Sequence, residues 1–316
     1  MNERPRIVFM GTPEFAVESL KKIMEKGYNV VGVVTAPDKP AGRGKKIKKS
    51  AVKEFAEKQG LKILQPANLK SEEFNKELQE LNPDIQVVVA FRMLPEKVWK
   101  LPRKGTFNLH ASLLPDYRGA APINWAIING ETETGVTTFF IDDKIDTGKI
   151  ILQKKIPLHM HENATQVHDK LKETGSDLVI ETLELISNNK VNPIPQPDSK
   201  QPKKAPKLNK ENTRINWNKN GKEIYNFIRG LSMYPGAWTE WITEDEPKKL
   251  IIYKASFIPE KHSLQPGEII ASKKEMKIAV PDGFILPEML KLQGKKMMDI
   301  RSFLNGLKKK KNLKVL

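Results

Sequence analysis

The sequence contains no cysteine, and this absence excludes several kinds of chemistry. Without thiols there is no disulfide framework, no thiolate nucleophile and no Cys-ligated zinc. No apolar run approaches the roughly 18 residues of a transmembrane helix. The first apolar run, residues 7–10, is too short for the core of a signal peptide. We therefore expect a cytoplasmic protein without a membrane span.

The glycine patterns of common phosphate-binding loops are also missing. Gly11 follows the first predicted strand, but the second glycine of the dinucleotide fingerprint G-x-G-x-x-G is absent. The stretch AGRGKK (residues 41–46) has the wrong spacing for a Walker A loop, and its lysine precedes neither Ser nor Thr. These absences argue against nicotinamide, flavin and P-loop nucleotide enzymes. We interpret residues 37–50 as a flexible basic loop.

Positive charge is abundant and unevenly distributed. The 316 residues include 54 Lys and Arg against 38 Asp and Glu, a net charge of +16. Residues 1–190 hold 29 basic and 25 acidic side chains, whereas residues 191–316 hold 25 and 13. The later part therefore carries +12, which is typical of a surface that binds a polyanion such as a nucleic acid.

A seam divides the chain into two predicted domains. Residues 188–207 are rich in proline and polar residues and show no apolar period, so they should run extended. We place a linker at residues 190–210, between a domain of residues 1–189 and a smaller domain of residues 211–316.

Apolar runs alternate with amphipathic helical patterns in the first domain. This alternation predicts a doubly wound, mostly parallel α/β sheet, whose ligand site lies outside the carboxyl ends of the strands. The predicted strands are residues 6–10, 29–35, 62–65, 84–90, 105–110 and 135–141. The predicted helices are residues 14–26, 50–59, 71–81 and 165–187.

Three polar residues follow or end predicted strands. Asn108 and His110 are two positions apart at the end of one strand, so their side chains leave it on the same face. Asp146, in the stretch IDDKIDTG (141–148), comes just after another strand. We expect the three to meet at one edge of the sheet. Taken singly, a strand-end amide, a core histidine and an Asx turn are simpler interpretations.

Ordered motifs give the chain a family resemblance. They are MGTPEFA (10–16), NLHASLLP (108–115) with RGAAPI (118–123), GVTT (135–138) with IDTG (145–148), and YNFIR (225–229) with YPGAW (234–238). Together they resemble the methionyl-tRNA formyltransferase family over essentially the whole chain. The resemblance implies a C-terminal β-barrel of the oligonucleotide-binding type. We expect a monomer.

The family moves a formyl group from 10-formyltetrahydrofolate to the amino group of methionine on initiator tRNA. Attack of an amine on a formyl carbon creates a tetrahedral oxyanion, which a fixed hydrogen-bond donor stabilises. Asn108 fits that role through its amide. The amine must lose a proton and the leaving nitrogen must gain one, which suits His110 and Asp146. This chemistry requires no metal.

The resemblance also implies the residues that hold both substrates. After the strand 84–90 this chain reads AFRMLP, where the family has Ala-Tyr-Gly. The implied folate site comprises Ser112, Leu113, Leu114, Pro115, Phe91, Arg92, Leu94 and Asp142. The basic loop is implied to meet the acceptor stem, and other cations to contact tRNA phosphates. The implied tRNA-binding residues are Arg43, Lys45, Lys46, Lys48, Lys49, Lys207 and Arg229.

Other interpretations explain only part of the pattern. A formyltransferase acting on a small amine has no need of a separate domain with a charge of +12. A nucleic-acid-binding protein without activity leaves the three strand-end residues unexplained, and a folate-dependent hydrolase would not need the basic loop. His159 and His161 lack an evident third metal ligand, so chance explains them better. Trp238 and Trp241 either stack bases or pack in the core.

Overall fold

The computed structural model describes residues 4–41, 46–197, 201–242, 246–307 and 313–316. The chain forms two compact units. Unit 1 comprises Met1–Gly119, Thr134–Ile156 and His168–Lys204, and unit 2 comprises Ala120–Glu133, Pro157–Val167 and Ala205–Leu316. Within the described ranges, no helix combines the length and the apolar character needed to cross a bilayer.

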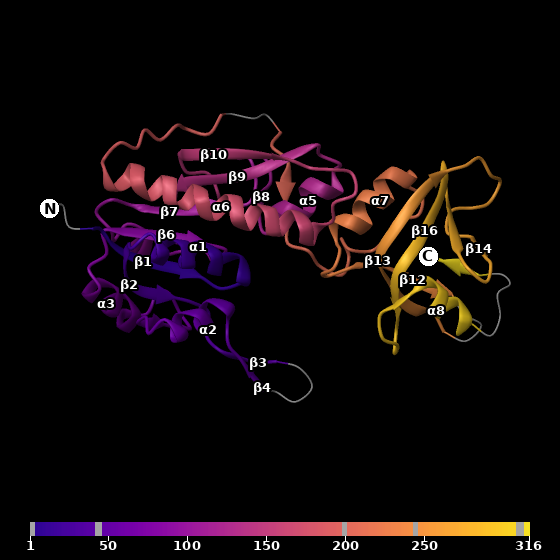
Figure 1. Cartoon of the computed structure of the whole chain (residues 1–316), viewed down its shortest axis with the longest axis horizontal. Coiled ribbons are helices and arrows are strands. Elements are labelled where there is room, and N and C mark those ends of the chain that lie inside the picture. The colour runs from indigo at the N-terminus through magenta and orange to yellow at the C-terminus, as the bar shows by residue number, and fades with distance from the viewer. Residues whose placement is uncertain (1–3, 42–45, 198–200, 243–245, 308–312) are drawn as a thin grey trace. The chain divides into compact units, whose positions relative to one another are not determined.

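Unit 1 is built on a seven-stranded sheet in the order β10-β9-β7-β6-β1-β2-β5, which can be followed from β10 to β2 in Figure 1. The pairs β1–β2, β1–β6, β2–β5 and β6–β7 are parallel, and β7–β9 is antiparallel. The strands are β1 (Arg6–Gly11), β2 (Asn29–Val34), β5 (Ile63–Leu64), β6 (Ile85–Val89), β7 (Thr106–His110), β9 (Glu133–Phe140) and β10 (Ile150–Pro157).

Apolar faces explain how the helices pack onto this sheet. α1 buries Phe15, Leu20 and Ile23 at helical spacing, and α2 begins where the Ser50 hydroxyl accepts a hydrogen bond from the Lys53 amide. The helices associated with unit 1 are α1 (Glu14–Glu25), α2 (Ala51–Lys58), α3 (Glu72–Glu80), α4 (Glu96–Trp99) and α6 (Ala164–Ser187), whose first turn belongs to unit 2.

The predicted α/β fold is confirmed, and every predicted strand and helix is present within two residues at each end. The sequence interpretation missed β10, which lies at the edge of the sheet. Its residues include three exposed polar side chains in a row, Gln153, Lys154 and Lys155, and this pattern hides its strand character.

Residues 37–50 were predicted to be a flexible basic loop, but both ends of this segment form regular strands. β3 (Lys39–Ala41) pairs with β4 (Lys46–Lys48) as an antiparallel hairpin. Arg43 and Lys45 lie outside the described residues.

Unit 2 contains an antiparallel sheet in the order β14-β15-β16-β13-β12-β18, with β17 paired to β16. A bridge between Glu268 and Lys314 joins the two ends of this order, so the sheet nearly closes into a barrel. Its strands are β12 (Ala237–Ile242), β13 (Lys248–Pro259), β14 (Ile269–Ala271), β15 (Met276–Val280), β16 (Gly283–Leu292), β17 (Met298–Asp299) and β18 (Lys314–Val315).

Helices accompany this barrel, and one of them covers its core. α7 buries Ile224 and Ile228 in a cluster with barrel residues such as Trp241, Leu250 and Ile285. The helices of unit 2 are α5 (Pro122–Ile128), α7 (Gly221–Gly230) and α8 (Ile300–Asn305). Two short strands remain, β8 (Arg118–Gly119) in unit 1 and β11 (Lys204–Ala205) at the boundary.

One substitution at two positions tests where the core of unit 1 lies. Ile7 on β1 is fully buried, whereas Ile47 on β4 is 72% exposed. We expect Ile7→Ala to lower the free energy of unfolding by about 2–5 kcal/mol, because it removes buried methyl groups and leaves a cavity. Ile47→Ala should change it by less than about 0.5 kcal/mol. Urea unfolding followed by circular dichroism measures both, and equal effects would contradict this core assignment.

Candidate active site

β7 places Asn108 and His110 on one face of the sheet. Asn108 pairs with Val88 of β6 and Phe139 of β9, and His110 pairs with Thr137. Asn108 is half-buried, and among the described residues its side-chain amide has no hydrogen-bond partner. Because β7 pairs with β6 and β9, the backbone of Asn108 is fixed, while its side-chain NH₂ group remains available to a ligand.

His110 is buried and has one well-defined polar contact. Its Nε2 lies 2.9 Å from the carbonyl oxygen of Tyr117. A carbonyl only accepts hydrogen bonds, so we assign the proton to Nε2. The neutral ring then presents the lone pair of Nδ1 towards Asp146, whose Oδ2 is 3.8 Å away. That distance is too long for a hydrogen bond, and a neutral Nδ1 and an ionised carboxylate both only accept, so one of the two must carry a proton before they can bond.

Asp146 reaches His110 because its loop folds back. β9 runs antiparallel to β7, and its last residue, Phe140, lies opposite Phe107 rather than His110. The expectation of two carboxyl ends at one edge was therefore wrong. Instead, the Phe140 amide donates to the Lys149 carbonyl, and a Cβ on Gly148 would lie 1.6 Å from the Phe140 oxygen. This close approach requires glycine and brings residues 141–149, the Asp146 loop, back over β9.

The carboxylate of Asp146 is held on one side only. Its Oδ2 accepts a hydrogen bond of 2.9 Å from the Gly119 amide. In the described part of the chain, Oδ1 has no hydrogen-bond partner. The Asp146 backbone is left-handed, with φ 55°, which is less costly for Asp than for most residues. The free oxygen can accept a proton from a bound molecule.

The implied folate segment 112–115 is held by its own polar groups. The Ser112 hydroxyl donates to the Asp116 carbonyl, and the Thr137 hydroxyl donates to the Ser112 carbonyl. Gln153 donates to the Leu114 carbonyl and to the Thr137 hydroxyl, 2.9 Å from each. Ser112 and Leu114 are buried, whereas Leu113 and Pro115 are half-buried. The Ser112 side chain is thus already engaged.

The segment after β6 is also occupied by internal contacts. Arg92 donates to the carbonyls of Pro66 and Ala67, and its guanidinium lies 5.5 Å from the centre of the Phe91 ring. Leu94 is buried in an apolar cluster with Val8 and Met10, and Phe91 packs against the same cluster. Leu94 therefore belongs to the core.

Asp142 shapes the start of the Asp146 loop. Its Oδ1 accepts hydrogen bonds from the Lys144 amide at 3.1 Å and the Thr147 hydroxyl at 2.7 Å. These contacts form an Asx turn, so this oxygen is used within the loop.

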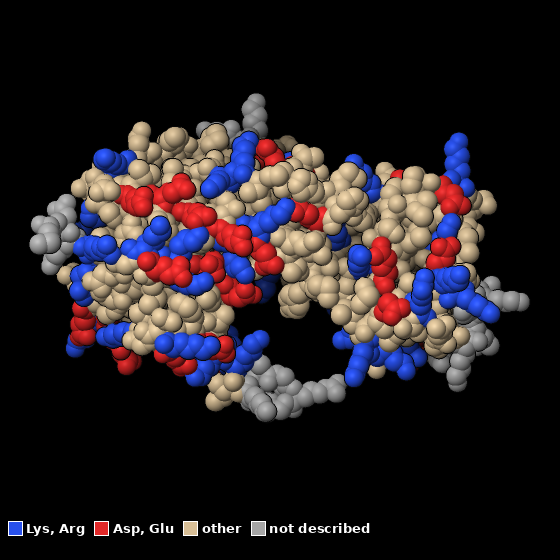
Figure 2. Space-filling model, in the orientation of Figure 1, with Lys and Arg blue, Asp and Glu red and all other residues tan. Residues whose placement is uncertain are grey.

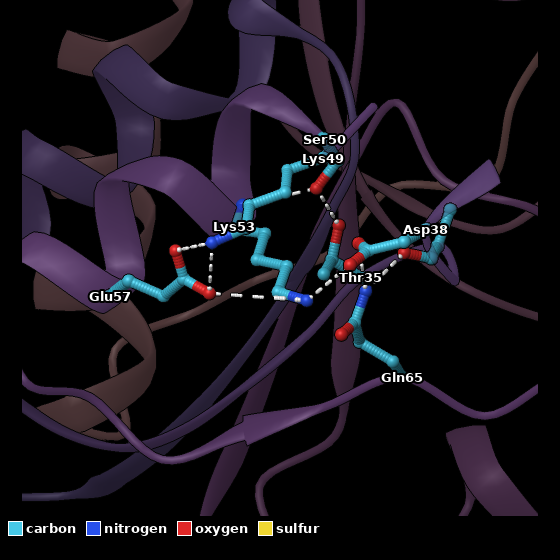
Figure 3. A network of polar contacts seen from close by, with 8 residues as sticks. Thr35, Asp38, Lys49, Ser50, Lys53, Glu57 and Gln65 are labelled. Carbon is cyan, nitrogen blue, oxygen red and sulfur yellow. Dashed lines mark hydrogen bonds and ion pairs between the residues drawn. The ribbon is translucent and has the colours of Figure 1, made fainter. Parts of the chain in front are cut away.

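A polar network anchors the base of the basic hairpin (Figure 3). Lys53 of α2 lies 2.6 Å from Asp38, and Gln65 donates to the other oxygen of Asp38 at 2.9 Å. Hydrogen bonds from Lys53 and Gln65 lower the pKa of Asp38. Thr35 and Ser50 are 2.7 Å apart through their hydroxyls. Both ends of the hairpin are thereby fixed to unit 1.

The predicted tRNA-binding cations differ in how they are placed. Lys48 and Lys207 are exposed, and the exposed Lys49 forms an ion pair of 2.7 Å with Glu57, which raises the pKa of Lys49. The side chains of Arg43, Lys45 and Lys46 lie outside the described part of the structure.

Arg229 does not fit the phosphate contact predicted for it. It is 7% exposed, its Nε donates to Asn226 and its Nη1 donates to the Glu162 carbonyl at 2.7 Å. Burial lowers the pKa of this guanidinium. We correct its assignment to a structural role inside unit 2.

The tryptophans of β12 belong to the barrel. Trp238 and Trp241 are 6% and 3% exposed, and Trp241 packs against Phe303. This burial decides between the two interpretations in favour of packing. His159 and His161 belong to no cluster suited to a metal ion among the described residues.

Sequence reasoning missed Gln196, which lies in the predicted linker. Its Nε2 donates to the carbonyls of Asp146 and Gly148, and its Oε1 accepts from Arg118. A single glutamine among prolines gives no periodic signal, so only the folded structure shows these contacts.

Comparisons with known proteins agree with this architecture. Family models match residues 5–183 as formyl transferase and residues 207–308 as its C-terminal domain. Methionyl-tRNA formyltransferase from Flavobacterium johnsoniae is 58% identical over 305 residues, covering 96% of this chain and 97% of the relative. The same enzyme from Bacteroides thetaiotaomicron is 54% identical over 308 residues, covering 96% of each.

Solved structures share the fold at lower identity. The N-formyltransferase from Helicobacter canadensis, in complex with folinic acid and dTDP-3-aminofucose, has a TM-score of 0.65 and 24% identity, covering 89% of this chain and 98% of its own. HypX from Aquifex aeolicus with tetrahydrofolic acid has a TM-score of 0.64 and 20% identity, covering 96% of this chain and 47% of its own. With both family models matched and relatives of more than 50% identity along its length, the chain belongs to the methionyl-tRNA formyltransferase family.

Proposed function

We propose that this protein transfers the formyl group of 10-formyltetrahydrofolate to the amino group of methionine on initiator tRNA. The observation that carries the proposal is the 58% identity with the Flavobacterium johnsoniae enzyme, which extends through both units. The folates in the neighbouring Helicobacter and Aquifex structures support a folate donor.

Asn108 is the proposed oxyanion donor. As the methionine nitrogen bonds to the formyl carbon, negative charge develops on the formyl oxygen. The Asn108 amide sits on a fixed central strand with its donor free, so it can stabilise that charge without reorganisation.

Asp146 and His110 are proposed to handle the proton. The Asp146 oxygen that has no partner among the described residues accepts the proton of the attacking amine. The same proton is returned to the leaving nitrogen as its bond to the formyl carbon breaks. His110, oriented by the Tyr117 carbonyl, presents Nδ1 to Oδ2 of the same carboxyl group and accepts a hydrogen bond when the proton is on that oxygen.

The formyl donor, 10-formyltetrahydrofolate, is proposed to bind through backbone groups and apolar surface rather than through polar side chains. The Ser112 hydroxyl and the Arg92 guanidinium are engaged with carbonyls, and Leu94 is in the core. The segments 91–94 and 112–115 then contribute their peptide groups and the apolar surface of Phe91 and Leu113. This arrangement tolerates the AFRMLP sequence, since peptide groups do not depend on the side chain.

Contacts with tRNA are proposed to come from the basic hairpin and unit 2. Figure 2 shows basic side chains gathered along one margin of unit 2 in this view, whereas both signs are interspersed over unit 1. Lys210, Arg214 and Lys249 lie over the Trp238 ring, 5.7, 5.3 and 4.9 Å from its centre. Such a cluster suits phosphate binding.

We propose that residues 1–189 carry the catalytic groups and residues 211–316 position the RNA. Residues 190–210 connect the two parts and, as far as Lys204, pack with unit 1. A cytoplasmic monomer is the simplest form for an enzyme whose two substrates are both in the cytoplasm.

The activity is tested by incubating the protein with 10-formyltetrahydrofolate and charged initiator tRNA, then weighing the amino acid released from the tRNA. Formylmethionine is the expected product. Formylation of a small amine such as an amino-sugar nucleotide, with none on the tRNA, would instead assign the chain to a small-amine formyltransferase.

Removing the amide donor of Asn108 should slow turnover without unfolding the protein. We expect Asn108→Ala to lower kcat by about 10²-fold or more, because the oxyanion loses its donor. Asn108→Asp keeps the shape but cannot donate when ionised, and it should lose as much. Single-turnover kinetics and thermal melting measure both variants, and activity within about tenfold of the parent would remove Asn108 from the mechanism.

Asp146→Asn should also lose about 10²-fold or more in kcat, because an amide cannot take up the proton. Asp143→Asn is the matched control, since Asp143 is exposed on the same loop. The control should keep the activity of the parent. Equal losses in both variants would indicate a general effect of charge on this loop.

Arg43 is predicted to contribute to the choice of tRNA, because its flanking glycines allow close approach to a base or a frayed end pair. We expect Arg43→Ala to lower kcat/KM for initiator tRNA more than for elongator tRNA. Lys48→Ala, at the end of β4, should weaken both alike and reduce the salt slope by about 0.7–0.9. An unchanged initiator-to-elongator ratio in Arg43→Ala would reduce Arg43 to a phosphate contact.

A further inference from the structure

Gln196 joins the predicted linker to the Asp146 loop. Its Nε2 lies 2.8 Å from the Asp146 carbonyl and 2.9 Å from the Gly148 carbonyl. We propose that Gln196 is a positioning residue, which holds the backbone of this loop so that the Asp146 carboxylate stays beside His110. The proposal rests on the proposed function, because it concerns the delivery of the same proton.

The two carbonyls need a donor to keep them together. Asp146 is left-handed, and the chain must turn sharply so that Gly148 can pack onto β9. Two carbonyl oxygens that lie close together repel each other, and a hydrogen-bond donor placed between them offsets this repulsion. The Gln196 NH₂ group supplies both hydrogens, one for each carbonyl.

Arg118 fixes which way the Gln196 amide points. Its Nε and Nη2 lie 3.1 and 2.5 Å from the Gln196 Oε1. A guanidinium only donates, so the atom facing it must be the oxygen, and the nitrogen must face the loop. Arg118 precedes Gly119, whose amide holds the Asp146 carboxylate. The same short strand, β8, therefore anchors the side chain of Asp146 directly and its backbone through Gln196.

The linker is itself attached at this point. Ile194 and Ile150 exchange two backbone hydrogen bonds of 2.8 Å, so the chain enters Gln196 alongside the start of β10. Gln196 is half-buried, and all these contacts lie within unit 1. The contacts of Ile194 and Gln196 are thus part of the fold of unit 1 rather than contacts of a free linker.

Gln196→Glu tests the donor while keeping the size of the side chain. The Glu oxygens can still accept from Arg118 but cannot donate to the two carbonyls. We expect kcat to fall at least about tenfold, because a misplaced catalytic group costs up to about 10²-fold. KM for charged tRNA should change less than about threefold. Asn192→Ala, an exposed position in the same linker, should retain the kcat of the parent.

A double substitution separates positioning of Asp146 from a general loss of structure. If Gln196 acts through Asp146, Gln196→Glu should cost less than about twofold once Asp146→Asn is present, because the two effects are not additive. The full-length variants are compared by single-turnover kinetics and thermal melting.

The outcomes are distinguishable. Full activity of Gln196→Glu, or a loss that adds fully to that of Asp146→Asn, overturns the positioning role while leaving the proposed chemistry intact. Full activity of Asp146→Asn overturns the proposed chemistry itself, and the positioning role falls with it. A fall in kcat caused by Gln196→Glu that appears when Asp146 is intact and disappears in the Asp146→Asn background supports the proposal.

Discussion

The site depends on the doubling back of residues 141–149 over β9. Phe140 lies opposite Phe107 rather than His110, and the packing of Gly148 on the Phe140 carbonyl helps to return the chain to His110. Without that contact Asp146 would be a surface carboxylate with no partner in reach. Because Gly148 admits no side chain there, the backbone itself sets the distance between the carboxylate and the imidazole.

Each polar group around the reacting atoms is either free or fixed by a backbone group. The Tyr117 carbonyl fixes the His110 tautomer and the Gly119 amide holds one oxygen of Asp146. The Asn108 amide and the other Asp146 oxygen have no partner among the described residues. The proposed formyl transfer relies on this division, because groups that already stand in place cost little reorganisation when charge develops.

The sequence was sufficient to predict those strands and helices whose apolar residues recur at a regular spacing. Apolar strands such as Arg6–Gly11 and amphipathic helices such as Glu14–Glu25 were predicted within two residues. Periodicity carries no sign of strand direction, however, so the antiparallel course of β9 was not foreseen. The three residues proposed for catalysis were identified from their spacing and from the family resemblance, and their roles remain predictions.

Burial explains most of the remaining differences. Arg229 in a family motif was interpreted as a phosphate contact, but the fold uses its donors on carbonyls inside unit 2. Gln196 gave no signal, since its partners are backbone atoms about 50 residues away along the chain, with separations of 50 and 48 positions. Contacts between a side chain and a distant backbone leave no pattern in composition or spacing.

The course of the linker also bears on how the protein is made. Unit 1 extends to Lys204, and the contacts of Ile194 and Gln196 belong to it. During synthesis the ribosome will therefore already have made Asn108, His110 and Asp146 while the segment that closes the Asp146 loop is still inside the exit tunnel. Unit 1 can complete its fold only after that segment has emerged, so the nascent chain passes through a stage in which the side chains proposed for catalysis exist and their scaffold does not.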